Sequence, residues 1–280
     1  MKYAVPVILI FSFFCSAVGA DDSRELASLP LFKQASGMIE KRYTFAVDKK
    51  AEFYFTPDRK SFYVLWIPGG KKSLAGVKTV YTLHGHGSTA FDEFYLWHAS
   101  CSQRGLAIIA LQWWFGKGEG SSDYYSPQDL NRIAEQILAA RNAGTGSVLL
   151  HGFSRGSANT YGVAALSRKS GRNYLGMVLS NAGGAAEDFP INRDITQGRF
   201  GENPFGDLPW ALYAGAKDPN PDRDGVTAME RTKSWLEKNG ARVVLFIKDT
   251  SGDHGGFHRN PANIAQALDA FEKIAPSGGK

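Results

Sequence analysis

Short apolar runs alternate with longer amphipathic segments along most of the chain, which is the pattern of strands that alternate with helices. From Thr79 onward, strands are predicted at 79–83, 106–111, 147–151, 175–181, 210–213 and 243–247. Helices are predicted between and after them, at 91–103, 127–142, 154–169, 226–238 and 263–274. This alternation predicts a mainly parallel sheet with helices on both faces.

The part before Thr79 has a different rhythm. A helical stretch is predicted around residues 22–40, and three closely spaced β-rich segments follow at Tyr43–Val47, Glu52–Thr56 and Ser61–Ile67. Their short connections predict antiparallel pairing. We therefore predict an α/β fold with a sheet of about eight strands that begins antiparallel, and we expect the chemistry in loops beyond the carboxyl ends of the parallel strands.

The first residues resemble a targeting segment. Lys2 precedes an apolar run from Val5 to Phe14, and Val18-Gly19-Ala20 offers the small residues that a signal peptidase needs. We predict a signal peptide over 1–20 and a single α/β domain over 21–280, secreted or periplasmic. A membrane anchor is the alternative, but the apolar run is shorter than the roughly 20 residues that span a bilayer.

Charge and cysteine content narrow the possible partners. The basic residues behind the formal net charge of +5 lie among acidic ones, so no nucleic-acid surface is predicted. We also predict a monomer with no membrane span after signal removal. Cys15 belongs to the predicted signal peptide, which leaves Cys101 as a single thiol. In its predicted helix, Cys101 is expected to be a small buried hydrophobe.

The strongest chemical signal is a G-x-S-x-G motif, Gly152-Phe153-Ser154-Arg155-Gly156, placed directly after an apolar strand and before a helix. A serine hydroxyl is a weak nucleophile, so it must be lifted out of the sheet beside a base, and small flanking residues permit the tight turn that this requires. A turn serine or a helix cap is the structural alternative. Because strand and helix lie where the turn needs them, we predict that Ser154 is a nucleophile.

A second glycine-flanked turn, His84-Gly85-His86-Gly87, also follows an apolar strand. Attack on an acyl carbon places negative charge on the carbonyl oxygen, and exposed backbone N–H groups stabilise that charge. The predicted oxyanion-hole donors are the backbone N–H groups of His86 and Arg155. Two histidines at this spacing are also compatible with zinc, although no third ligand lies nearby in the sequence.

These motifs, followed by a late aspartate and a later histidine, resemble the α/β-hydrolase superfamily over nearly the whole mature chain. Within it, the short single-domain esterases related to polyhydroxybutyrate depolymerases and feruloyl esterases are the most similar. The resemblance implies that the acid follows the strand at 210–213, as Asp218, and that the base follows the last strand, as His254.

The chemistry of the two residues also supports this pair, although other residues remain candidates for each role. His254 lies in a glycine-rich loop where a ring can face a cleft, whereas His258 precedes the last helix and is expected to pack. Asp218 lies at a strand end, where a carboxylate is held rigidly. Its rivals are Asp222, Asp224 and Asp253.

The loop at 220–225, together with Glu230, also resembles a calcium loop, although its acid falls one position early. Capping of the next helix by Asp224 is the alternative interpretation.

Three further features predict the character of the site. Arg155 could recognise a substrate carboxylate or form a structural salt bridge. Only 27 residues, Ala182–Leu208, separate two strands, so we expect an open site with little or no lid. Trp113 and Trp114, followed by Phe115, lie beyond a strand end, where we expect substrate contacts from some and core packing from at least one.

The sequence therefore predicts a carboxylic ester hydrolase with a catalytic triad of Ser154, His254 and Asp218, an acyl-enzyme intermediate, and a small or polymeric ester as substrate. No cofactor or metal is expected. A serine peptidase or amidase of the same fold is one alternative, and an exported binding protein without turnover is another.

Overall fold

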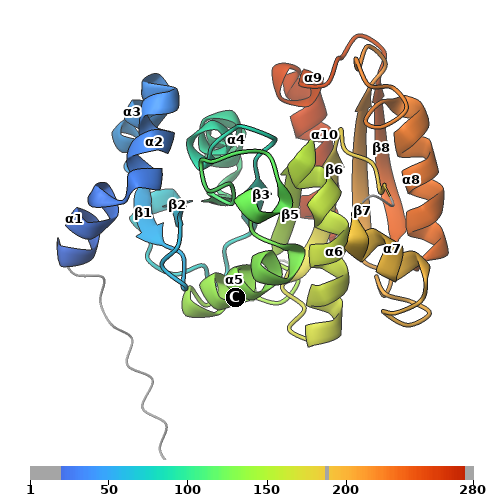
Figure 1. The fold of residues 1–280 in the computed structure, drawn as a ribbon, viewed down its shortest axis with the longest axis horizontal. Helices are drawn as coiled ribbons and strands as arrows, with labels where there is room; N and C mark the ends of the chain where they lie inside the picture. The colour runs from blue at the N-terminus through green and yellow to red at the C-terminus, as the bar shows by residue number, and fades with distance from the viewer. Residues whose placement is uncertain (1–19, 187–188, 275–280) are drawn as a thin grey trace, which may run out of the picture.

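The computed structural model describes residues 20–186 and 189–274, and these residues contain an eight-stranded sheet (Figure 1). Its strands are β1 (Glu52–Phe55), β2 (Phe62–Trp66), β3 (Thr79–Leu83), β4 (Ala107–Leu111), β5 (Val148–Phe153), β6 (Leu175–Asn181), β7 (Pro209–Gly215) and β8 (Arg242–Asp249). They lie in the order β1-β2-β4-β3-β5-β6-β7-β8. Because β2 pairs antiparallel with β1 and β4 and all other pairs are parallel, the predicted sheet is confirmed.

Helices cover both faces of the sheet. They are α1 (Ala20–Ser28), α2 (Pro30–Met38), α3 (Glu40–Asp48), α4 (Ala90–Arg104), α5 (Pro127–Ala140), α6 (Arg155–Ser170), α7 (Pro190–Thr196), α8 (Val226–Lys238), α9 (Gly256–Arg259) and α10 (Pro261–Ile274). Figure 1 shows α1, α2 and α3 gathered beside β1 at one edge and α8 beside β8 at the other.

The central strands β3, β4 and β5 are buried on both faces, which is why they appear in the sequence as nearly continuous apolar runs. In β3, Tyr81 and Leu83 pack in the core under α5, α6 and α8, whereas Val80 packs in the core under α2, α4 and α10. Successive side chains of a strand point to opposite faces. The sheet is therefore a rigid platform, and its carboxyl-end loops are what it positions.

One predicted strand is wrong. Tyr43–Val47 alternates aromatic and other residues as a strand does, but the structure places this segment in α3. Helical spacing sets Tyr43 and Ala46 on one face, so Ala46 is fully buried and Tyr43 packs edge-on against Phe32. Tertiary packing decides between helix and strand in such a short segment.

The predicted N-terminal helical stretch is divided. Pro30 at the start of α2 begins a new helix, since its ring fits a first helical position and it lacks an N–H to donate. The apolar run of the predicted signal peptide lies outside the described residues. Among those described, no helix is long and apolar enough to cross a membrane. Cys101 is fully buried in α4, and burial raises the pKa of its thiol, as expected for a packing residue.

Candidate active site

Ser154 lies in the tight turn between β5 and α6, with backbone angles φ 54° and ψ −116°. This left-handed conformation is uncommon for a residue with a side chain and carries strain. A Cβ atom on Gly152 would lie 2.4 Å from the carbonyl oxygen of Gly156, and one on Gly156 would lie 2.4 Å from that of Leu83. Both glycines are therefore required by close backbone approach, as the motif predicted.

The turn after β3 lies against this elbow. His84 is buried, its Nδ1 lies 2.8 Å from the carbonyl of Gly85, and burial lowers its pKa to about 4, so the ring is neutral. The N–H of His86 donates to no other backbone group of the described chain. The N–H of Arg155 opens α6, where first-turn amides lack an intrahelical acceptor. Both amides are thus free to serve as oxyanion donors.

The structure brings the three predicted triad side chains into one hydrogen-bonded row. His254 Nε2 lies 2.8 Å from Ser154 Oγ, and His254 Nδ1 lies 2.7 Å from Asp218 Oδ2. The other Asp218 oxygen accepts from the N–H of Asn220 at 2.8 Å, which fixes the carboxylate. The side chain of Asp218 is 1% exposed and that of His254 is 27% exposed, so the row runs from the interior toward solvent.

The rival residues lie elsewhere. Asp253 accepts from the N–H of Gly255 and pairs with Arg259, Asp222 is exposed, and His258 lies within a buried cluster. Asp224 comes closer, since it offers an oxygen within 4.8 Å of ligand atoms of Asp218 and His254. Burial raises the pKa of the Asp224 carboxyl, against the opposing attraction of His254 and Arg223.

The loop at 220–225 matches neither of its predicted interpretations. Gly225 caps α8 without a side-chain hydrogen bond, so Asp224 is not the cap. Glu230 pairs with Lys248 at 2.6 Å, and it does not join the other acids of the loop in any group of possible metal ligands among the described residues. The loop instead supplies Asn220, Arg223 and Asp224 to the cleft beside His254.

The cleft over Ser154 has a volume of about 550 Å³ and is mostly polar. Its described lining is His86, Glu119, Ser121, Ser154, Arg155, Ala158, Gly184, Ala186, Phe189, Pro190, Asn220, Arg223, Asp224 and His254. The segment between β6 and β7, which was expected to be too short for a large lid, contributes residues of this lining and the short helix α7.

Of the two interpretations of Arg155, the structural salt bridge is not formed with any described residue. The guanidinium carbon of Arg155 lies 4.1 Å from the centre of the Tyr124 ring, and its Nη1 donates to the carbonyl of Glu119 at 3.0 Å. Tyr124 and Glu119 gave no signal in the sequence, because neither belongs to a motif nor follows a strand end.

The prediction that Trp113 contacts substrate is wrong. This side chain is 1% exposed, and its indole N–H donates to the carbonyl of His84 at 2.9 Å. It packs against the His84–Gly87 turn, and it is the core-packing member expected among the three aromatics. Trp114 is half-buried, bonds to the carbonyls of Lys117 and Gly118, and is not part of the described cleft lining.

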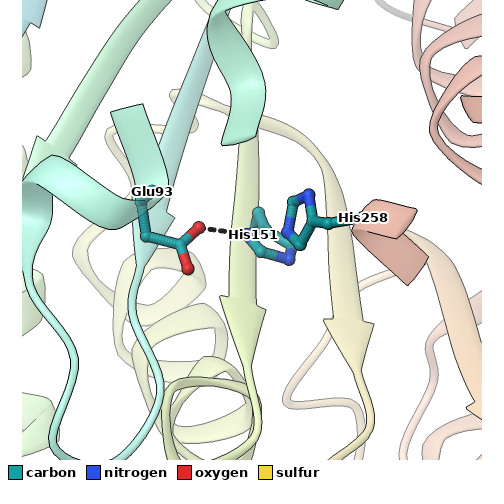
Figure 2. A group of neighbouring side chains, drawn as sticks. All are labelled: Glu93, His151 and His258. Carbon is teal, nitrogen blue, oxygen red and sulfur yellow. Dashed lines mark ion pairs between the residues drawn. The ribbon is translucent and has the colours of Figure 1, made fainter. Parts of the chain in front are cut away.

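A second cluster of polar side chains lies buried in the core (Figure 2). Figure 2 shows Glu93 of α4, His151 of β5 and His258 of α9 turned toward one another. Thr82 donates to Glu93 at 2.5 Å and lies 2.8 Å from His151 Nδ1. Burial alone would raise the pKa of Glu93, but contacts with His151, His258 and Thr82 outweigh it and lower the pKa to about 2.

This cluster offers metal-ligand atoms within 4.8 Å of one another. However, both ring nitrogens of His151 already have polar neighbours: Nδ1 lies 2.8 Å from the Thr82 hydroxyl and 3.3 Å from the indole nitrogen of Trp97, and Nε2 lies 3.3 Å from the side-chain amide of Asn181. Glu93 and His151 therefore belong to a hydrogen-bonded core network, and the His258 ring packs edge-on against His151. The other group of this kind, Asp218, Asp224 and His254, contains two members of the triad row. His84 and His86 belong to neither, so a zinc site there is not supported.

We expect His258→Phe to weaken the acid sensitivity of the fold. Both ring nitrogens of His258 are buried without a hydrogen-bond partner, and burial lowers its pKa to about 3. The unfolded chain, with an ordinary histidine pKa near 6.5, binds this proton first, so wild-type stability falls as pH drops from about 6.5 toward 3. The variant should lose about 1.4 kcal/mol less per pH unit in that window.

Urea unfolding from pH 8 to pH 5 measures this slope, and the two proteins should run parallel above about pH 7.5, where histidine is neutral in both states. Parallel curves below pH 6.5 as well would contradict the prediction.

Comparison with known proteins agrees with the architecture. No family model and no curated protein matches the chain. A thermostable esterase of known structure superposes with a TM-score of 0.55 at 16% sequence identity. The match covers 81% of this chain and 63% of that esterase. A Bacillus cereus carboxylesterase gives 0.53 at 14% identity over 83% of this chain and 99% of its own. TT1662 from Thermus thermophilus superposes with a TM-score of 0.56 at 18% sequence identity, over 80% of this chain and 97% of TT1662. At these identities the likeness concerns the fold alone, and the chain has the α/β-hydrolase fold.

Proposed function

We propose that this protein is a serine hydrolase of carboxylic esters. The observation that carries the proposal is the row from Asp218 through His254 to Ser154, with contacts of 2.7 and 2.8 Å, at the wall of an accessible cleft. A nucleophile in contact with a base that a carboxylate orients is the arrangement of acyl transfer. Esterases among the structural neighbours support the same chemistry.

In the proposed reaction, Ser154 Oγ attacks the ester carbonyl while His254 Nε2 takes the hydroxyl proton. The N–H groups of His86 and Arg155 hold the negative oxygen of the tetrahedral intermediate. His254 then gives its proton to the leaving alcohol, and an acyl group remains on Ser154. Water repeats the sequence and releases the acid, while Asp218 keeps the imidazole in the orientation and tautomer that both steps need.

A fluorophosphonate probe tests this proposal directly, because it reacts with a serine that a neighbouring base activates. We expect stoichiometric labelling of the folded wild-type protein, with the mass increase on the peptide that contains Ser154, and much slower labelling of His254→Ala. Aryl esters and matched anilides then separate an esterase from an amidase. A folded protein that the probe leaves unlabelled would be a binding protein, and the hydrolase proposal would be abandoned.

The narrower likeness to polyhydroxybutyrate depolymerases and feruloyl esterases is also a proposal. Short-chain, long-chain, feruloyl and polymeric esters, compared by kcat/KM, decide it. A mostly polar cleft favours esters that carry polar groups over long-chain lipids.

We further propose that the protein is exported and that its signal peptide is removed after Ala20. N-terminal sequencing of the protein purified from its natural compartment should begin at Asp21. An intact start at Met1 would count against export by this route.

A further inference from the structure

The guanidinium of Arg155 is fixed in the cleft without an acidic partner among the described residues. It stacks on Tyr124 at 4.1 Å, and Nη1 donates to the carbonyl of Glu119 and lies 3.4 Å from His86 Nδ1. Each of its hydrogen bonds to a described residue goes through Nη1. One edge of the guanidinium, formed by Nε and Nη2, is therefore left for another acceptor.

No carboxylate in the described lining of the cleft binds this edge of the guanidinium. Among the acids of the described lining, Glu119 pairs with His86 at 3.2 Å, and Asp224 lies beside His254. Arg223 is exposed at the cleft and, like Arg155, forms no ion pair within the described ranges 20–186 and 189–274. No described carboxylate contacts the Arg155 guanidinium, so this side chain gives the cleft wall next to Ser154 a positive local potential, which attracts anionic ligands.

The position of Arg155 ties this potential to the reacting atoms. Arg155 follows Ser154 directly and is the first residue of α6, whose N-terminus also favours negative charge. Both residues line the same cleft. The planar fork of a guanidinium matches a carboxylate in two parallel hydrogen bonds, and the stack on Tyr124 has already restricted its rotamers.

We propose that the cleft binds esters that carry a carboxylate close to the scissile bond, with Arg155 as the carboxylate-binding side chain and Arg223 as a second cation. The proposal rests on the ester hydrolysis proposed above. The carboxylate belongs either to the acyl part or to the alcohol part of the ester, and its recognition by a guanidinium is the same in both.

Matched substrate pairs test the proposal. On the acyl side, mono-para-nitrophenyl adipate is compared with its neutral methyl ester, and on the alcohol side, para-carboxyphenyl butyrate is compared with its neutral methyl ester. We expect wild-type kcat/KM to favour the anion of at least one pair by about tenfold to hundredfold, the range of a charge-assisted hydrogen bond. Arg155→Gln should bring this ratio close to one, and Arg223→Gln should lower it partly.

Arg172→Gln is the matched control, because it removes the same charge just beyond the far end of α6, where Arg172 pairs with Glu135. Its ratio should equal that of wild type. If the wild-type protein hydrolyses the neutral esters and prefers neither anion, the carboxylate proposal is overturned, whereas the proposed ester hydrolysis is retained.

Calorimetric titration of the wild-type protein with adipate gives a readout that does not depend on turnover. If the wild-type protein binds adipate, Arg155→Gln abolishes the binding, and no ester is hydrolysed, the carboxylate site would stand and the proposed function would be rejected. Absence of both binding and hydrolysis would remove both.

Discussion

Ser154→Ala should lower kcat for a simple aryl ester by about 10⁴- to 10⁶-fold, because no other group of the proposed mechanism can form the acyl intermediate. The residual rate over water would come from the oxyanion donors at His86 and Arg155, which the substitution leaves in place. Stopped assays with para-nitrophenyl butyrate at saturating substrate measure the change.

The fold should not change with it. Alanine keeps the Cβ atom at the strained elbow, so circular dichroism and the thermal midpoint should match those of wild type. Ser170→Ala is the matched control, because Ser170 ends the same helix that begins beside Ser154. Retention of even a hundredth of wild-type turnover by Ser154→Ala would assign the nucleophile elsewhere.

Gly156→Ala should damage both activity and stability. Its new methyl group would lie 2.4 Å from the carbonyl oxygen of Leu83 and 2.7 Å from that of His84. Neither atom can turn away as a side chain does, so α6 must move off the end of β3. We expect kcat/KM to fall by about 10²-fold or more, since a displacement near 1 Å at a reacting centre has that effect. Overpacking of this kind costs about 1–3 kcal/mol in the free energy of unfolding.

Gly37→Ala is the matched control for this substitution. Gly37 lies within α2, and a Cβ atom there would meet nothing within 4 Å. Alanine is a better helix former than glycine, so this variant should keep full activity and gain up to about 1 kcal/mol. Equal behaviour of the two variants in urea unfolding and ester turnover would argue against close approach at the elbow.

Much of the fold follows from the sequence because local pattern and tertiary packing agree in the parallel part. Strands such as β3 and β5 are buried on both faces and bounded by helices, so apolar runs mark them closely. The elbow at Ser154 was equally visible, since strand, glycine spacing and helix all lie within a few residues. Asp218 and His254 were placed by their position after strands, and the geometry unites them, while their catalytic roles are part of the proposal.

The features that the sequence concealed depend on contacts between distant segments. Tyr43 and Phe45 alternate as in a strand, yet packing against α4 and β1 holds them in a helix. Trp113 follows a strand end, as many substrate-binding residues do, but its indole turns inward to the carbonyl of His84. The partners of Arg155 come from the loop before α5, and no local sequence pattern predicts that the Tyr124 ring will stack on the Arg155 guanidinium.

The base and the nucleophile of the proposed site are separated by 100 positions along the chain. During synthesis, β5 and the elbow emerge long before β8, α9 and the loop that carries His254. A nascent chain that has folded only as far as β5 and the elbow therefore has Ser154 without its proposed base, and it would not hydrolyse esters. Hydrolytic activity would arise only when the last segment docks, so turnover would serve as a direct assay for completed folding.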